Sequence, residues 1–126
     1  MRYKILTLLW MVLIFASSSI PSFDFPQVSF WGWAKLIHLI YFGVLCFLVR
    51  KTLQDQKIFP SLTKNSVLFA FLFATGYGMT DELHQLFTLG RHPQVTDVLI
   101  DALGACLYIA GAKIVGFFKL RRARTA

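Results

Sequence analysis

Four long apolar runs, separated by polar segments, dominate the pattern of this 126-residue chain. The runs cover about residues 3–20, 30–49, 65–86 and 96–118. A helix needs about 20 apolar residues to cross the hydrocarbon core of a bilayer, and each run has about that length. The pattern therefore predicts an all-α integral membrane protein, a bundle of about four transmembrane helices.

The segments between the runs contain residues that end helices. Pro21 follows the first run, and residues 22–29 are expected to form a loop. Residues 52–64 are polar and include Pro60, so they predict a connecting loop or a surface helix. Residues 90–93, which begin with glycine and end with proline, predict a turn.

The third run passes into the polar sequence Asp-Glu-Leu-His-Gln at residues 81–85 without a glycine or proline. We therefore expect the helix to continue through it. Small residues also recur at a spacing of four, which predicts close helix packing. They form two stripes: Ala70, Ala74 and Gly78 in the third run, and Ala112 and Gly116 in the fourth.

The first run has a second interpretation, because a basic start and a small-residue end are typical of a signal peptide. Arg2 and Lys4 precede the run, and residues 16–19 read Ala-Ser-Ser-Ser. We favour a retained helix, since the run is long enough to span a membrane and three more such runs follow it.

Composition agrees with a membrane location: 56% of the residues are hydrophobic, 15% are charged and the mean hydropathy is +0.61. The net charge of +7 does not indicate nucleic-acid binding, because the basic residues gather at the ends of the apolar runs. Cys46 and Cys106 both lie within apolar runs, where we expect small buried hydrophobic residues and no disulfide.

The basic residues also predict orientation. Under a four-span topology, Lys35 and Arg91 lie on the side opposite to both termini. Ten others share the side of the termini: Arg2, Lys4, Arg50, Lys51, Lys57, Lys64, Lys119, Arg121, Arg122 and Arg124. The positive-inside rule therefore predicts cytoplasmic termini. The chain is expected to form a single domain, residues 1–126.

Acidic residues gather on the outer side of the predicted bundle. Five of the six are there, and only Asp55 is cytoplasmic; the five are Asp24, Asp81, Glu82, Asp97 and Asp101. Helical spacing puts polar groups on one face of three helices, in the sets Lys35 and His38; Asp81, His84 and Gln85; and Asp97 and Asp101. Because lipid solvates such groups poorly, these faces should meet in a polar pocket that opens outward.

The charge of this pocket limits its partners. Lys35 and Arg91 against Asp81, Glu82, Asp97 and Asp101 give a formal sum of −2. A cation or metal, protonated carboxyl groups, or a positively charged substrate would each offset this charge, and the sequence identifies no cofactor or metal among them. An alternative is that the network is structural and only holds the helices in register. No standard zinc, serine-hydrolase or phosphate-loop motif is present.

The run from Asp81 to Phe87, followed by Gly90-Arg91, Asp97-Val98 and Gly104-Ala105, resembles the signature of VanZ-like membrane proteins. Residues 18–21 and 35–38 are similar to earlier motifs of this family, so the resemblance covers roughly residues 17–111. Three positions differ from the usual pattern: Leu89 replaces proline, Asp101 replaces asparagine and Ala34 replaces aspartate. Asp101 adds a negative charge, so a charge model for the family does not transfer directly.

The resemblance implies a multi-pass protein of the bacterial cell (inner) membrane, in a group named for low-level resistance to teicoplanin. The motif positions it matches are Lys35, His38, Asp81, Glu82, His84, Gln85, Arg91, Asp97 and Asp101. Our first hypothesis is that the pocket binds a lipid-linked envelope precursor, a lipid head group or a lipopolymer. In this hypothesis the acids and Gln85 take hydroxyl or ammonium groups and Arg91 holds a phosphate or carboxylate.

Two other classes of function stay open. A membrane hydrolase or transferase could act on a lipid-linked phosphate or ester, with catalytic candidates Asp81, Glu82, His84 and His38. In that case His84 or His38 would be the general base, and Asp81 would orient it. The third class is a structural subunit whose motif fixes helix register.

Overall fold

The regular structure of the described residues, 2–21 and 31–125 of the computed structural model, is entirely helical. The all-α prediction is confirmed for this part of the chain. The five helices of these described residues are α1 (Arg2–Ser18), α2 (Trp31–Asp55), α3 (Pro60–Lys64), α4 (Ser66–Gln85) and α5 (Val95–Thr125). Four of them fall on the four apolar runs, and α3 lies in the polar connection before α4.

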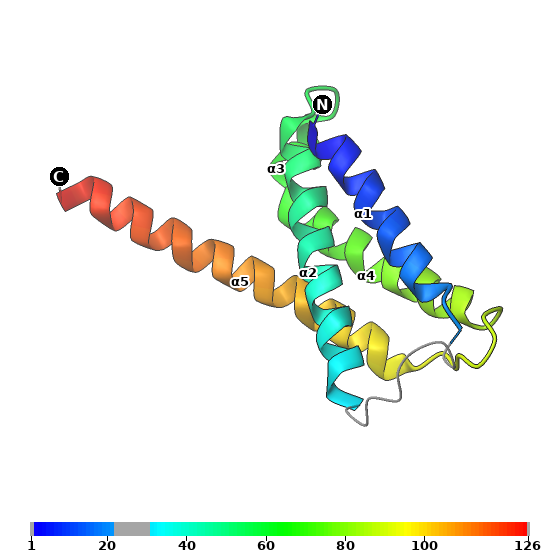
Figure 1. The fold of residues 1–126 in the computed structure, drawn as a ribbon. Helices are drawn as coiled ribbons and strands as arrows, with labels where there is room; N and C mark the ends of the chain where they lie inside the picture. Colours follow the sequence, from blue (N-terminus) through cyan, green and yellow to red (C-terminus); the bar gives the residue numbers. More distant parts are fainter. Residues whose placement is uncertain (1, 22–30, 126) are drawn as a thin grey trace.

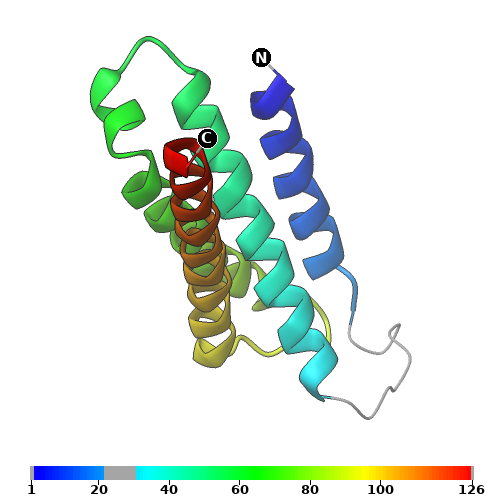
Figure 2. The same ribbon diagram turned by 90° about the vertical axis from the view of Figure 1, so that its left-hand side faces the viewer.

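The helix α2 is central, since it contacts α1, α4 and α5, while α4 also packs against α5 (Figures 1 and 2). The helices α1 and α4 end at the side of the molecule where α2 and α5 begin. The helix α5 then crosses α2, and its last turns extend away from the other helices (Figure 1). We call residues 110–124 the distal half of α5.

Two of the described helices, α2 over Gly32–Asp55 and α5 over Val95–Arg124, are long and apolar enough to cross a membrane. Only 28% of the apolar window of α2 and 17% of that of α5 is buried, whereas the core helix of a water-soluble protein is mostly buried. The helix α1 has 17 residues, and α4 has 20 residues but carries Asp81 and Glu82 near its end.

The helices differ from the apolar runs mainly at their ends. The helix α2 continues beyond residue 49 to Asp55, because Arg, Lys, Leu and Gln are good helix formers and no glycine or proline intervenes. The helix α5 likewise continues through the basic tail to Thr125. The predicted surface helix in residues 52–64 is α3, with Pro60 in its first turn.

The predicted helix continuation is confirmed, and the turn predicted at residues 90–93 is found earlier, over residues 86–90. The helix α4 runs through residues 81–85 and ends at Gln85. Gly90 then has a φ of 74°, which only glycine adopts without strain, and the Arg91 N–H donates to the Thr88 carbonyl.

The core lies between α1, α2, α4 and α5, and its side chains come largely from α2. The stripe predicted from small residues in α4 is confirmed, since Ala70 and Ala74 are fully buried and Gly78 faces α5. The stripe in the distal half of α5 makes no comparable packing, because a Cβ on Gly116 would meet no atom within 4 Å among the described residues. Cys46 is buried as predicted, but the prediction for Cys106 is wrong, because it is exposed on α5.

Two glycines allow α2 and α5 to cross in close contact. A Cβ on Gly43 would lie 3.1 Å from the Gly104 carbonyl oxygen. A Cβ on Gly104 would lie 3.1 Å from Leu39 Cα and nearer still to the Leu39 carbonyl oxygen. Backbone atoms cannot rotate away as a side chain can, so this crossing requires glycine at residue 104.

Candidate functional site

Polar side chains of α2 and α5 pair in register near the start of both helices. Lys35 Nζ forms an ion pair with Asp97, and it donates to Gln94 Oε1 at 3.2 Å and to Thr96 Oγ1 at 3.1 Å. One turn further along both helices, His38 Nδ1 lies 3.0 Å from Asp101 Oδ1. The helical repeat brings each pair to the same interface, because the residues are separated by three positions on α2 and by four on α5.

The helix α4 contributes its last turn to the same region. Gln85 Nε2 donates to Glu82 Oε1 at 3.2 Å and to Asp81 Oδ2 at 3.5 Å. The backbone N–H of Gln94, just before α5, donates to Glu82 Oε2 at 2.7 Å. Glu82 therefore ties the end of α4 to the start of α5.

The three helices converge on one point. Ligand-type atoms of His38, Glu82 and Asp97 all lie within 4.8 Å of one another. These three come from α2, α4 and α5 respectively. We call the group that they form with their partners the polar centre: Lys35, His38, Asp81, Glu82, Gln85, Asp97 and Asp101.

The acidic groups of the polar centre are almost inaccessible. Asp101 is 0% exposed, and Asp81 and Glu82 are each 5% exposed. Asp101 Oδ2 is buried without a hydrogen-bond partner, and it points towards Gly78, where a Cβ would lie 2.5 Å from it. Four carboxylates and the one ammonium group of Lys35 give the polar centre a formal charge of −3 with His38 neutral.

Two of the predicted site residues lie elsewhere. His84 Nε2 lies 2.9 Å from Ser19 Oγ, and its ring lies against Phe15, with 4.3 Å between ring centroids. The guanidinium group of Arg91 donates to the carbonyl oxygens of Ile20 at 3.2 Å and Ser17 at 3.5 Å. Both residues thus bind the end of α1, whereas the other seven predicted positions form the polar centre.

The predicted outward opening involves residues that the structure does not describe. Residues 22–30, which connect α1 to α2, lie outside the described residues, and so does Asp24. Within the described part, the side chains of His38, Asp97 and Lys35 keep 15%, 13% and 12% exposure, whereas that of Asp101 keeps none. The opening stays a prediction.

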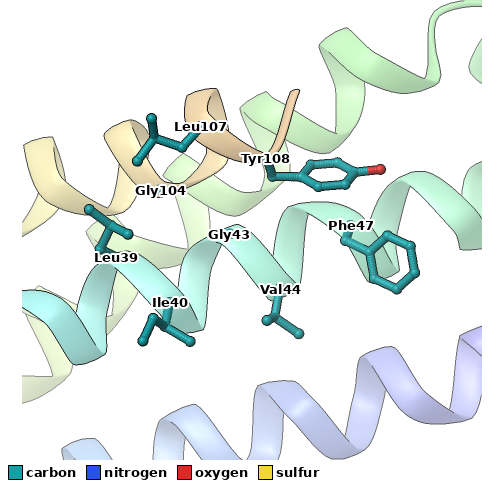
Figure 3. Close-up of a pocket in the computed structure, with 8 residues that line it drawn as sticks. All are labelled: Leu39, Ile40, Gly43, Val44, Phe47, Gly104, Leu107 and Tyr108. Carbon is teal, nitrogen blue, oxygen red and sulfur yellow. The ribbon is translucent and has the colours of Figure 1, made fainter. Parts of the chain in front are cut away.

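An open apolar groove lies beside the polar centre, between α2 and α5 (Figure 3). It begins at Leu39, the neighbour of His38, and at Gly104, which lies one turn after Asp101. Its floor is the glycine crossing, and its walls are formed by Leu39, Ile40, Val44, Phe47, Leu107 and Tyr108. The exposed surface of this groove is nearly all apolar.

Several residues of the site carry no strong signal in the sequence. Gln94 and Thr96 share the Lys35 ammonium group, Ser19 contacts His84, and Gly78 leaves space for Asp101. The only available hint for Gln94 and Thr96 is their place in the first turn region of a helix that follows a proline. Contacts of this kind depend on how the helices pack.

Comparison with known proteins gives one match. A family model described as VanZ/LLP1 matches residues 3–116 of the chain. No curated protein and no solved structure gives a significant match. The matched range contains the whole polar centre and the groove.

Proposed function

The chain belongs to the VanZ/LLP1 family, and on that premise we propose that it is a four-span protein of the bacterial inner membrane whose polar centre binds the head group of an amphiphilic ligand. In this proposal residues 1–126 form one domain with cytoplasmic termini. The two span-length apolar helices and the basic residues that follow the apolar runs support it.

The observation that carries the proposal is the contact between a polar and an apolar feature. The polar centre ends at His38 and Asp101, and the apolar groove begins at Leu39 and Gly104. A ligand with a polar head and an acyl or prenyl chain matches this arrangement of a polar surface next to an apolar one. The chain of such a ligand would lie in the groove above the glycine crossing, which opens to the bilayer in the proposed orientation.

The charge of the polar centre favours particular head groups. Carboxylates accept hydrogen bonds from hydroxyl and ammonium groups, and Lys35 offers a cation to a phosphate or carboxylate. Sugar and amino-sugar head groups that carry a phosphate combine these features. The proposed ligands are therefore a lipid-linked envelope precursor, a phospholipid head group or a lipopolymer, and binding of a wall precursor would connect the protein to teicoplanin resistance.

The role first expected for Arg91 changes in this proposal. Its guanidinium group binds carbonyl oxygens at the end of α1, so we assign the anionic part of the ligand to Lys35. Arg91 is then a positioning residue that holds α1 against α4 and α5.

The test measures retention of a labelled polyprenyl diphosphate sugar by protein in lipid nanodiscs. We expect Glu82→Gln to lower the affinity at least tenfold, because it removes a buried charge from the head-group site. Leu107→Trp should lower it by filling the groove. Asp55→Asn, which neutralises an exposed acid at the other end of α2, is the matched control and should bind as the unmodified protein does. Unchanged retention by folded Glu82→Gln and Leu107→Trp would refute the proposal.

One geometry favours an enzyme as the second candidate. His38 is oriented by Asp101, and Ser19 Oγ lies 2.9 Å from His84 Nε2, within reach of a base. Ser19 donates its hydroxyl proton to the Phe15 carbonyl oxygen at 2.7 Å, so it would have to turn from that carbonyl to His84 before it could act as a nucleophile. Either pair could serve a hydrolase or transferase that acts on a lipid-linked phosphate or ester. Release of product from the same labelled lipid, abolished by His38→Gln or by Ser19→Ala, would support this candidate.

A further inference from the structure

The polar centre contains the donor set of a metal site. His38, Glu82 and Asp97 offer one imidazole nitrogen and two carboxylate oxygens within 4.8 Å of one another. Because the three residues come from three helices, their approach is a product of the tertiary fold and not of local sequence. Exposed acidic groups are common on surfaces, but here Glu82 is 5% and Asp97 is 9% exposed.

His38 is oriented as metal-binding histidines usually are. Such a histidine gives its second ring N–H to a carboxylate, which fixes the tautomer and the direction of the free nitrogen. His38 Nδ1 lies 3.0 Å from Asp101 Oδ1, and the ring is nearly parallel to that of Phe42, with an interplanar angle of 11°. With Nδ1 engaged by Asp101, Nε2 is the nitrogen that a metal ion would take.

The two carboxylates keep the capacity to bind an ion. Each oxygen of a carboxylate has two acceptor positions. Glu82 Oε1 and Oε2 each accept one hydrogen bond, from Gln85 and Gln94, so each has a position left. Asp97 pairs with Lys35 through Oδ1, which leaves Oδ2. Zinc ligands in a tetrahedral site are roughly 3.4 Å apart, so small side-chain rotations would complete the site from the present spacing.

Charge supports the same conclusion. The polar centre has a formal charge of −3, and a divalent cation would reduce it to −1. Buried carboxylates without a cation are costly, and Asp101 Oδ2 has no hydrogen-bond partner to offset its burial. A cation would also let a centre with four carboxylates accept a phosphate.

We propose that His38, Glu82 and Asp97 bind one divalent transition-metal ion of the Zn²⁺ or Mn²⁺ type, with Asp101 orienting His38. The imidazole ligand favours these ions over Mg²⁺ and Ca²⁺, which prefer oxygen ligands alone. Three protein ligands leave a coordination position open. What the ion does there rests on the proposed function: its open position takes the phosphate of the head group together with Lys35, which pairs with Asp97.

The test uses the full chain in nanodiscs, stripped with a chelator and then equilibrated with Zn²⁺, Mn²⁺ or Mg²⁺. We expect elemental analysis to give one Zn²⁺ or Mn²⁺ per chain and no retained Mg²⁺. Co²⁺ should give visible absorption bands of a site with nitrogen and oxygen ligands. Glu82→Gln and His38→Ala should lower Zn²⁺ affinity at least a hundredfold, and Asp101→Asn should lower it 10- to 100-fold by its effect on His38.

A control separates this site from other histidines. His92→Ala, which changes a histidine outside the ligand set, should bind Zn²⁺ as the unmodified protein does. Less than stoichiometric Zn²⁺ and Mn²⁺ on the unmodified protein would overturn the proposal, whether or not any variant folds. Equal Zn²⁺ affinity of folded Glu82→Gln would also overturn it.

The outcome is distinguishable from that of the proposed function. If the unmodified protein binds no metal but retains the lipid, and Glu82→Gln loses that retention, the head-group site is supported and the metal site is refuted. If the unmodified protein binds stoichiometric metal but does not retain the lipid, the metal site is supported and the head-group site is refuted.

Discussion

The polar centre and the distal half of α5 lie in the same chain but are opposite in character. In the polar centre, ionisable side chains are buried and paired, and Asp101 is 0% exposed. In the distal half of α5, Phe117 and Phe118 are 56% and 57% exposed, and residues 110–124 pack against little of the chain. An arrangement with charges inside and large apolar groups outside is unfavourable in water.

The comparison is consistent with lipid as the solvent of this protein. Apolar side chains gain little by leaving lipid, so they need not be buried in the protein. Charged side chains gain much by meeting one another, so they direct which helix faces come together. In the proposed membrane location, the polar centre therefore depends on the packing of the helices, whereas the distal half of α5 needs no such packing.

The largest expected contrast is between two phenylalanines. Phe42 is 0% exposed in the core, and Phe42→Ala should lower the free energy of unfolding by about 3–5 kcal/mol, because it leaves a cavity between packed helices. Phe118→Ala, in the distal half of α5, should change it by less than about 0.5 kcal/mol. Unfolding in detergent, followed by helical circular dichroism, measures both. Equal effects would contradict the comparison.

A second contrast uses two lysines. Lys35→Met should destabilise the protein by about 3 kcal/mol, because Asp97 is left with its buried charge unpaired. Lys113→Met, on the exposed face of α5, should cost less than about 0.5 kcal/mol. Adding Asp97→Leu to Lys35→Met should restore part of the loss, and the double-mutant cycle should give a coupling above about 1 kcal/mol. Additive effects of the two changes would argue against the ion pair.

The smallest contrast is between two glycines, whose replacement by alanine should change the stability in opposite directions. Gly104→Ala should destabilise by about 1–3 kcal/mol, because its Cβ would press on the backbone of Leu39. Gly111→Ala, where a Cβ meets no described atom within 4 Å, should stabilise the helix by up to about 1 kcal/mol. Thermal melting of the two variants tests this prediction, and a destabilised Gly111→Ala would show that the distal half packs on something in solution.

Much of the fold was predictable because the local sequence largely determines where a helix forms. Each apolar run predicted a helix, and the absence of breakers predicted that α4 continues to Gln85. The ends of α2 and α5 were less predictable, because the limit of an apolar run marks the limit of lipid contact and not the end of a helix. The exposure of Cys106 was missed for a related reason: in such a sequence an apolar neighbourhood does not imply burial.

The membership of the polar centre was partly predictable, since polar groups on apolar helices should face one another. Asp81 was expected to share a face with both His84 and Gln85, but Glu82 decides between them. Gln85 is three residues from Glu82 and bonds to it, whereas His84 is two residues away and turns to α1.

The pairing of partners across helices was not predictable. Lys35 with Asp97 and His38 with Asp101 both require the register between α2 and α5, which the glycine crossing determines. The spacing of residues within a single helix does not reveal how two helices are aligned with each other.

The sequence separation of these partners has a consequence for synthesis. Asp97 lies 62 residues after Lys35, and Asp101 lies 63 residues after His38. At about 5–20 residues per second, the ribosome makes Lys35 and His38 roughly 3–13 s before Asp97 and Asp101. In the proposed membrane location, a nascent chain of this protein therefore carries a lysine and a histidine on its second helix for seconds before translation supplies Asp97 and Asp101 as their partners.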